Sequence, residues 1–172
     1  IDGIERIRLG SIEPLLITEE FVERLEKLEK ICHHFHLSLQ SGCDETLKRM
    51  NRRYTIEQFR NIVNILRNTY KDVNLTTDII VGFPGETKED MLRTIDYIAH
   101  SGAQGIKFHL LHLMKNTKMA EQYYNGEFEL LSEEDYIDLI CQGISMIPEE
   151  MVVHRLTGDA PRATLIGPMW SL

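Results

Sequence analysis

Apolar positions along the chain follow two patterns that alternate with each other. Short runs rich in β-branched residues predict strands, and longer stretches with apolar residues at helical spacing predict helices. The predicted strands cover residues 4–9, 35–39, 74–81, 105–113 and 151–156. Helices are predicted after Thr18, over 44–50, after Thr55, between Thr87 and Gly102, over 117–125 and over 132–147.

Three of these helices begin with a threonine that can accept a hydrogen bond from a free backbone N–H. Gln58 stands three residues after Thr55, which completes a capping box. The helix after Thr18 has one apolar face, formed by Phe21, Val22, Leu25 and Leu28. Such helices cover a sheet with one side and face water with the other.

Strands and helices in this order predict an α/β fold. Right-handed crossovers through a helix join neighbouring strands, so the predicted sheet is parallel with flanking helices. Four regular βα units are too few for a closed eight-stranded barrel, and an open sheet and a partial TIM-like barrel both fit the pattern. Residues 1–172 are expected to form a single domain, with a tail containing glycine and proline from about residue 148.

Polar residues gather where the predicted strands end, which is where α/β folds bind ligands, while the strand bodies are expected to be apolar. Strand by strand they are Ser11 and Glu13, then Gln40 and Ser41, then Gly82, Phe83 and Pro84, and then His109 and His112. Asp78 lies inside an apolar strand, so it needs either a neighbouring cation or a ligand as its partner. The turn at 82–85 is open to two interpretations, simple turn chemistry or a close approach of a ligand to the backbone.

Charge and hydropathy exclude some classes of function. The net charge is −8, with 27 acidic and 19 basic residues, whereas a general nucleic-acid platform is basic. Basic residues cluster once, at Lys48, Arg49, Arg52 and Arg53, where a solvated helix end and a contact to a carboxylate, a phosphate or RNA are both open. No apolar run can span a bilayer and no leader opens the chain, so we expect a cytoplasmic protein without a membrane partner.

The positions of cysteine and histidine do not predict a metal site. Cys32, Cys43 and Cys141 are spaced by eleven and ninety-eight residues, which matches no close-set metal motif. Among His33, His34 and His36 only the last two share a face of a strand. His109 and His112 are expected on opposite faces. Catalytic zinc sites need three converging ligands, which none of these groups provides.

Four stretches of the first half resemble the tRNA methylthiotransferases, which are radical S-adenosylmethionine (SAM) enzymes. They are Ile4-Glu-Arg-Ile-Arg-Leu-Gly-Ser-Ile-Glu-Pro14, His36-Leu-Ser-Leu-Gln-Ser-Gly42, Leu47-Lys-Arg-Met-Asn-Arg-Arg-Tyr-Thr55 and Thr76-Thr-Asp-Ile-Ile-Val-Gly-Phe-Pro-Gly-Glu-Thr87. Beyond about Asp90 the chain is similar to a second branch, the YhcC-like radical SAM proteins of undefined substrate. That likeness lies in residues 105–112, 154–159 and 165–172. The sequence is thus a mosaic of two branches, natural or engineered.

The resemblance implies the part of a radical SAM core that begins at the family's third strand. Three cysteines hold a [4Fe–4S] cluster in this family, and this chain lacks them, so catalysis is expected to need a segment outside it. The SAM-binding residues that the resemblance implies are Ser11, Glu13, Gln40, Ser41, Arg52, Arg53, Asp78, Gly82, Phe83 and Pro84. One of the two arginines suits a carboxylate contact. The methylthiotransferase likeness also implies tRNA as a partner.

Three functions remain open at this point. The chain is either part of a radical SAM enzyme of the methylthiotransferase or YhcC-like kind, or a non-catalytic fragment or chimera of that fold without a cofactor. The second describes the isolated chain better. A third reading, a phosphate-binding α/β enzyme, rests on residues 82–86 before the helix start at Thr87. The lysine that phosphate loops supply is not in place there.

The first predicted strand is apolar and forms an edge of the expected sheet, with unpaired backbone groups on one side. We therefore predict that the chain dimerises or aggregates through residues 4–9. Light scattering at high protein concentration measures this association. A monodisperse monomer would contradict the prediction.

Overall fold

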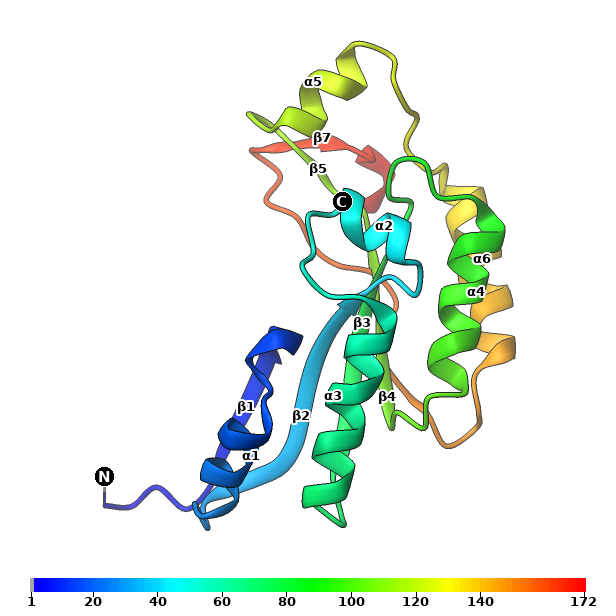
Figure 1. Cartoon of the computed structure of the whole chain (residues 1–172). Coiled ribbons are helices and arrows are strands. Elements are labelled where there is room, and N and C mark those ends of the chain that lie inside the picture. The colour runs from blue at the N-terminus through cyan, green and yellow to red at the C-terminus, as the bar shows by residue number, and fades with distance from the viewer. Residues whose placement is uncertain (1) are drawn as a thin grey trace.

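The computed structural model describes residues 2–172. A parallel sheet of five strands lies at its centre, in the order β1-β2-β3-β4-β6 (Figure 1). The strands are β1 (Ile7–Ile12), β2 (Ile31–Gln40), β3 (Asn74–Val81), β4 (Gly105–Leu110) and β6 (Val152–Arg155). Each crossover places the next strand beside the last, as short right-handed connections do. The predicted α/β fold with a parallel sheet and flanking helices is confirmed.

Four helices flank this sheet: α1 (Glu19–Glu26), α3 (Ile56–Thr69), α4 (Lys88–Ala99) and α6 (Glu133–Met146). The shorter α2 (Asp44–Arg49) and α5 (Lys118–Tyr124) lie toward the carboxyl ends of the strands (Figure 1). There β5 (Leu113–Met114) pairs antiparallel with β7 (Leu165–Gly167) in a second sheet, beside the 3-10 helix η2 (Met169–Ser171). Another 3-10 helix, η1 (Pro14–Leu16), follows β1. No helix in the described residues is long and apolar enough to cross a membrane.

One face of the five-stranded sheet is apolar and covered by the helices. Phe35, Ile79 and Phe108 are fully buried on it and come from the three central strands. Leu66, Ile95 and Leu139 from α3, α4 and α6 belong to the same core cluster. Burying one such side chain contributes about 1.5–3 kcal/mol of transfer free energy. The stability of the fold therefore rests mainly on this face.

The predicted helix caps are confirmed. Thr18 Oγ1 accepts a hydrogen bond from the Phe21 backbone N–H at 3.1 Å. Thr55 and Gln58 form the predicted capping box, with hydrogen bonds of 3.2 and 2.9 Å. Leu28 was wrongly placed on the buried face of α1. The helix ends at Glu26, and Leu28 is 54% exposed.

Three predicted strands have wrong boundaries. β2 begins at Ile31 and not at residue 35. β1 covers Ile7–Ile12 and not 4–9, because its pairing with β2 continues as far as Ile12 opposite Leu37. The register shifts twice along β1, and Ser11 has a φ of 48°. Ser11 therefore lies inside the strand and not after it. β1 remains an edge of the described sheet, and self-association through it remains a prediction.

β4 ends at Leu110, although a strand was predicted as far as residue 113. The Leu111 backbone N–H still donates to the Val81 carbonyl at 3.0 Å. The chain then leaves the large sheet, and Leu113 and Met114 pair with β7. Since His112 lies beyond the strand, strand alternation does not fix its side relative to His109.

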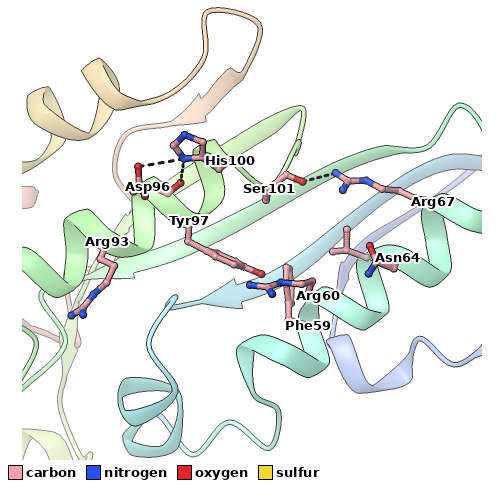
Figure 2. A pocket seen from close by; sticks show the side chains of 10 residues that line it. Phe59, Arg60, Asn64, Arg67, Arg93, Asp96, Tyr97, His100 and Ser101 are labelled. Carbon is pink, nitrogen blue, oxygen red and sulfur yellow. Dashed lines mark hydrogen bonds and ion pairs between the residues drawn. The ribbon is translucent and has the colours of Figure 1, made fainter.

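A groove of about 570 Å³ runs between α3 and α4 in the helical layer. Figure 2 shows arginines of both helices along it, but most of them have partners. Arg67 donates to the Ser101 carbonyl at 2.7 Å, and Arg60 lies over the Tyr97 ring at 5.9 Å. His100 approaches Asp96 at 3.3 Å. The contacts of Arg67 and Arg60 join α3 to α4 and to the turn that follows it, so we assign the groove a structural role.

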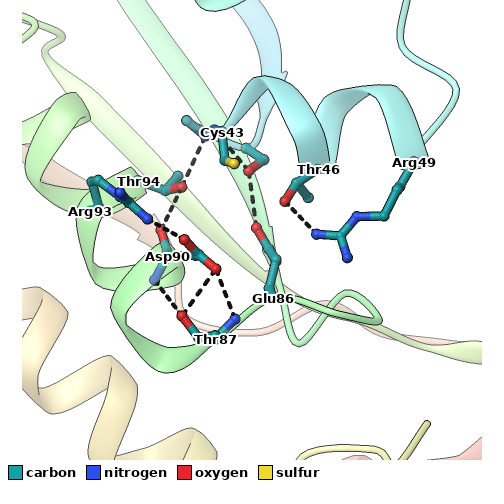
Figure 3. A network of polar contacts seen from close by, with 10 residues as sticks. Cys43, Thr46, Arg49, Glu86, Thr87, Asp90, Arg93 and Thr94 are labelled. Carbon is teal, nitrogen blue, oxygen red and sulfur yellow. Dashed lines mark hydrogen bonds and ion pairs between the residues drawn. The ribbon is translucent and has the colours of Figure 1, made fainter.

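Glu86, in the turn after β3, connects this turn to the end of β2 (Figure 3). Ser41 Oγ donates to Glu86 Oε1 at 3.0 Å, while Glu86 Oε2 is buried without a partner among the described residues. Arg49 extends over this turn and donates to Thr46 Oγ1 at 3.1 Å. Burial raises the pKa of Glu86, and the hydrogen bond from Ser41 opposes that shift. The charged form is therefore disfavoured by folding.

We predict that Glu86→Gln stabilises the protein at pH 7 and that this gain shrinks as the pH falls. The pKa of Glu86 is higher in the folded than in the unfolded state. The wild-type Glu86 side chain therefore contributes fully to the free energy of unfolding when the pH is below its pKa in the unfolded state. This contribution is lost as the pH rises through its pKa in the folded state. Urea unfolding between pH 4 and pH 8 measures the difference. The control is Glu89→Gln at an exposed position of α4, and parallel curves for both variants would contradict the prediction.

Candidate functional site

The second face of the sheet is polar, in contrast to the apolar strand bodies that we predicted. Side chains alternate between the two faces of a strand, and the helices cover only one of them. We call the other side the inner face. It is formed by Arg8, His34, His36, Thr76, Asp78, Lys107, His109, His154 and Arg155. Polar groups from all five strands thus share one surface.

Asp78 lies at the centre of the inner face. Gln40 Nε2 donates to Asp78 Oδ1 at 2.7 Å, and His36 Nε2 lies 3.5 Å from Asp78 Oδ2. Lys107 Nζ follows at 3.4 Å from His36 Nε2. The partners of the Asp78 carboxylate are therefore the Gln40 amide and the His36 imidazole, and the Lys107 ammonium group contacts that imidazole. The side chain of Asp78 is 13% exposed, so its carboxylate still reaches open space.

Two hollows adjoin along this face. The upper hollow, of about 310 Å³, is lined by Gln40, Asp78, Ile80, His109, Leu110, Leu111 and His112. The lower hollow, of about 480 Å³, is lined by Arg8, Ser11, His36, Asp78, Lys107, His109, His154 and Arg155. Asp78 and His109 line both hollows, so the two hollows share part of their walls. Their volumes lie in the range of small-molecule sites.

His109 and His112 line the same hollow, so the prediction that they face opposite ways is wrong. Burial lowers the pKa of His109, and the nearby carboxylate of Asp78 opposes this. Burial likewise lowers the pKa of His112, against the charge of Asp159. His112 Nε2 lies 3.1 Å from Ser171 Oγ. Both rings therefore favour the neutral form at pH 7, in which imidazole can donate one hydrogen bond and accept another.

The carboxyl ends of β1 and β2 form the rim above the hollows. There Arg52 Nη1 lies 3.4 Å from Glu13 Oε2, while Arg52 Nε is buried without a partner in the described chain. Tyr54 donates its hydroxyl to the Ser38 and Leu39 carbonyls at 2.6 and 3.0 Å. Burial raises the pKa of Tyr54, which keeps it a donor. Gln40 itself has a φ of 70°, a conformation that costs about 1–3 kcal/mol in a residue other than glycine.

The remaining predicted residues do not line the two hollows. Ser41 is buried against Glu86, and Arg53 is exposed without a hydrogen bond or ion pair in residues 2–172. Gly82 has a φ of 81°, and a Cβ there would lie 2.9 Å from Leu131 Cδ1. The turn and the packing of Leu131 thus account for this glycine. Phe83 and Pro84 lie partly exposed in the same turn.

Sequence reasoning placed His109 and His112 at the ligand-binding strand ends, but it missed five other polar residues of the hollows or considered them only as metal ligands. They are Arg8, His36, Lys107, His154 and Arg155. A signal was present in β2, β3 and β4, where polar residues recur at every second position. His34, His36 and Ser38 show it most clearly. A period of two marks a second polar face and not an entirely buried strand.

An iron–sulfur cluster does not fit the described residues. Cys32 lies in β2, Cys43 precedes α2 and Cys141 is exposed on α6. Residues 2–172 contain no group of three His, Cys, Asp or Glu side chains that could hold a metal ion. SAM fits better, since its carboxylate matches the unpartnered Arg52 Nε, and Gln40 and Asp78 offer further polar contacts.

Two family profiles match the chain. The Radical SAM superfamily profile matches residues 1–98, and the Radical_SAM C-terminal domain profile matches residues 103–172. β1, β2 and β3 lie in the first segment and β4 and β6 in the second, yet all five share one sheet.

Curated relatives of both expected kinds are found. The chain is 39% identical over 173 residues to "Uncharacterized protein YtqA" of Bacillus subtilis. The matched region covers 100% of this chain and 53% of that protein. It is 47% identical over 98 residues to a tRNA-2-methylthio-N(6)-dimethylallyladenosine synthase of Thermoanaerobacter, with 57% of this chain and 21% of that protein covered. The chain thus spans about half of the first relative and about a fifth of the second.

Solved structures show the same fold. Elp3 of Methanocaldococcus infernus superposes with a TM-score of 0.80 at 20% identity, over 94% of this chain and 37% of that one. Coproporphyrinogen III oxidase of Escherichia coli, a radical SAM enzyme, gives a TM-score of 0.62 at 18% identity, over 81% of this chain and 31% of that one. The sheet therefore has the TIM-like fold of these structures, and the chain belongs to the radical SAM superfamily.

Proposed function

We propose that this chain forms the SAM-binding part of a radical SAM catalytic core. The observation that carries the proposal is the hydrogen bond of 2.7 Å between Gln40 and Asp78, at the carboxyl end of the sheet and beside the two hollows. Because no cluster fits residues 2–172, we propose that its ligands come from residues outside this range.

In this proposal, different side chains of the site bind different parts of SAM. Arg52 would hold the SAM carboxylate, since its Nε is free and its Nη1 is already oriented by Glu13. Gln40 and Asp78, which line the upper hollow, would hold polar groups of the ribose and the amino acid portion. Ser11 lines the lower hollow and takes no part in these SAM contacts. SAM supplies radical hydrogen-abstraction chemistry in this superfamily, and the protein supplies its orientation.

For the whole protein we propose a tRNA methylthiotransferase-like activity. The support is the 47% identity over 98 residues to an enzyme whose name includes this chemistry. The basic cluster adds little, because Arg52 contacts Glu13 and Arg49 contacts Thr46. Only Lys48 and Arg53 of that cluster remain for RNA.

A second candidate is a YtqA-type radical SAM protein acting on another substrate. The likeness to YtqA covers 100% of the chain, whereas the synthase covers 57%. Filter binding of tRNA at several salt concentrations separates the two candidates. Saturable binding favours the methylthiotransferase-like activity, and its absence favours the YtqA type.

We predict that isothermal titration calorimetry detects SAM binding to the chain and that Asp78→Asn weakens it about tenfold or more. A hydrogen bond to a charged group contributes about 1.5–3 kcal/mol, which corresponds to such a factor. Asp72→Asn is the matched control, because Asp72 is exposed in the turn before β3. Circular dichroism verifies that both variants are folded.

Absence of SAM binding by the wild-type chain would contradict this proposal and support the non-catalytic alternative. A longer form of the protein provides the second arm of the test. After anaerobic iron–sulfide reconstitution and reduction of the cluster with dithionite, it is expected to cleave SAM to 5′-deoxyadenosine and methionine, whereas a form without cluster absorbance and without cleavage would exclude the catalytic core.

A further inference from the structure

The lower hollow concentrates positive charge in a protein of net charge −8. Arg8 from β1, Lys107 from β4 and Arg155 from β6 reach it from three strands. Asp78 is the one carboxylate among the residues that line it, and this carboxylate already accepts a hydrogen bond from Gln40. The charge of the hollow is therefore opposite in sign to that of the whole chain.

None of the three cations forms an ion pair with a carboxylate within residues 2–172. Arg8 Nε donates to His34 Nδ1 at 3.0 Å, and Lys107 Nζ lies 3.4 Å from His36 Nε2. Both contacts are to imidazole nitrogens and not to carboxylates. The cations thus have no counter-charge of their own, which is costly for groups brought together on one surface.

Histidine rings complete the lining. A Cβ at Gly105 would lie 2.4 Å from His154 Nε2, so this glycine leaves the space that the His154 ring occupies on the inner face. Burial and the charge of Lys107 lower the pKa of His154, and burial lowers that of His109, in both cases toward the neutral form. The neutral rings of His109 and His154 lie beside three cations and can donate hydrogen bonds to a bound anion. Each ring can also take up a proton when the anion binds.

We propose that the lower hollow binds an oxyanion, a carboxylate or a phosphate, that belongs to the substrate. Lys107 and Arg155 are its main ligands, Arg8 closes one side, and His109 and His154 contribute hydrogen bonds. The assignment to a substrate rests on the proposed function, because SAM would occupy the upper hollow and Arg52. Arg52 and Glu13 lie at the rim and line neither hollow. The site itself depends only on the residues described above.

The test titrates the wild-type chain with inorganic phosphate and, separately, with succinate, at constant ionic strength set by sodium chloride. Histidine side-chain NMR signals report binding at His109 and His154. We expect saturable shifts of both rings, with one of the two anions preferred. The double variant Lys107→Met/Arg155→Met is expected to lower that affinity at least tenfold. Lys27→Met/Lys71→Met removes two exposed charges elsewhere and is expected to leave it unchanged.

Three results would overturn the inference. They are the absence of saturable shifts, an equal loss of affinity in both double variants, and displacement of the anion by saturating SAM, which would make the hollow the subsite of the SAM carboxylate. A calorimetric titration with SAM separates this inference from the proposed function. SAM binding without anion binding refutes the anion site alone, and anion binding without SAM binding supports the site while refuting the proposed function.

Discussion

The Gln40 amide and the Asp78 carboxylate meet because β2 and β3 are parallel neighbours that end at the same edge of the sheet. In such a pair every second side chain points to the same face. One face buries Phe35, Ile79 and Phe108 under the helices, so the apolar requirement of folding is met on that side. The other face is free to carry polar groups, and the candidate site depends on this separation.

Local backbone strain occurs where the site is built. Ser11 and Gln40 both adopt positive φ, and the register of β1 or β2 shifts beside each of them. A strained residue persists only when its surroundings hold it. Here the Tyr54 hydroxyl bonds to two carbonyls of β2, and Asp78 accepts from the Gln40 side chain. The fold thus fixes the orientation of Gln40, which is what a rigid binding group needs.

The order and type of the major elements could be predicted from the sequence, because helix caps such as Thr18 and Thr55 and runs such as 74–81 are local signals. Gln40, Asp78, Ser11, Glu13 and Arg52 were also identified, because polar groups at strand ends stand out. The polar inner face was missed, since Lys107 and His154 become neighbours only through strand pairing across 47 residues. Gly82 illustrates the opposite error, because it was predicted to contact a ligand although its turn and the packing of Leu131 explain the glycine.

The most direct test of the account follows the side-chain amide of Gln40 by NMR while SAM is added to glutamine-labelled protein. The other glutamines, Gln58, Gln104, Gln122 and Gln142, lie outside the two hollows and serve as internal references. If SAM binds beside Gln40 and Asp78, the amide signals of Gln40 alone will show a saturable shift. Unchanged Gln40 signals at SAM concentrations that saturate binding would contradict it, because the ligand would then lie elsewhere on the protein.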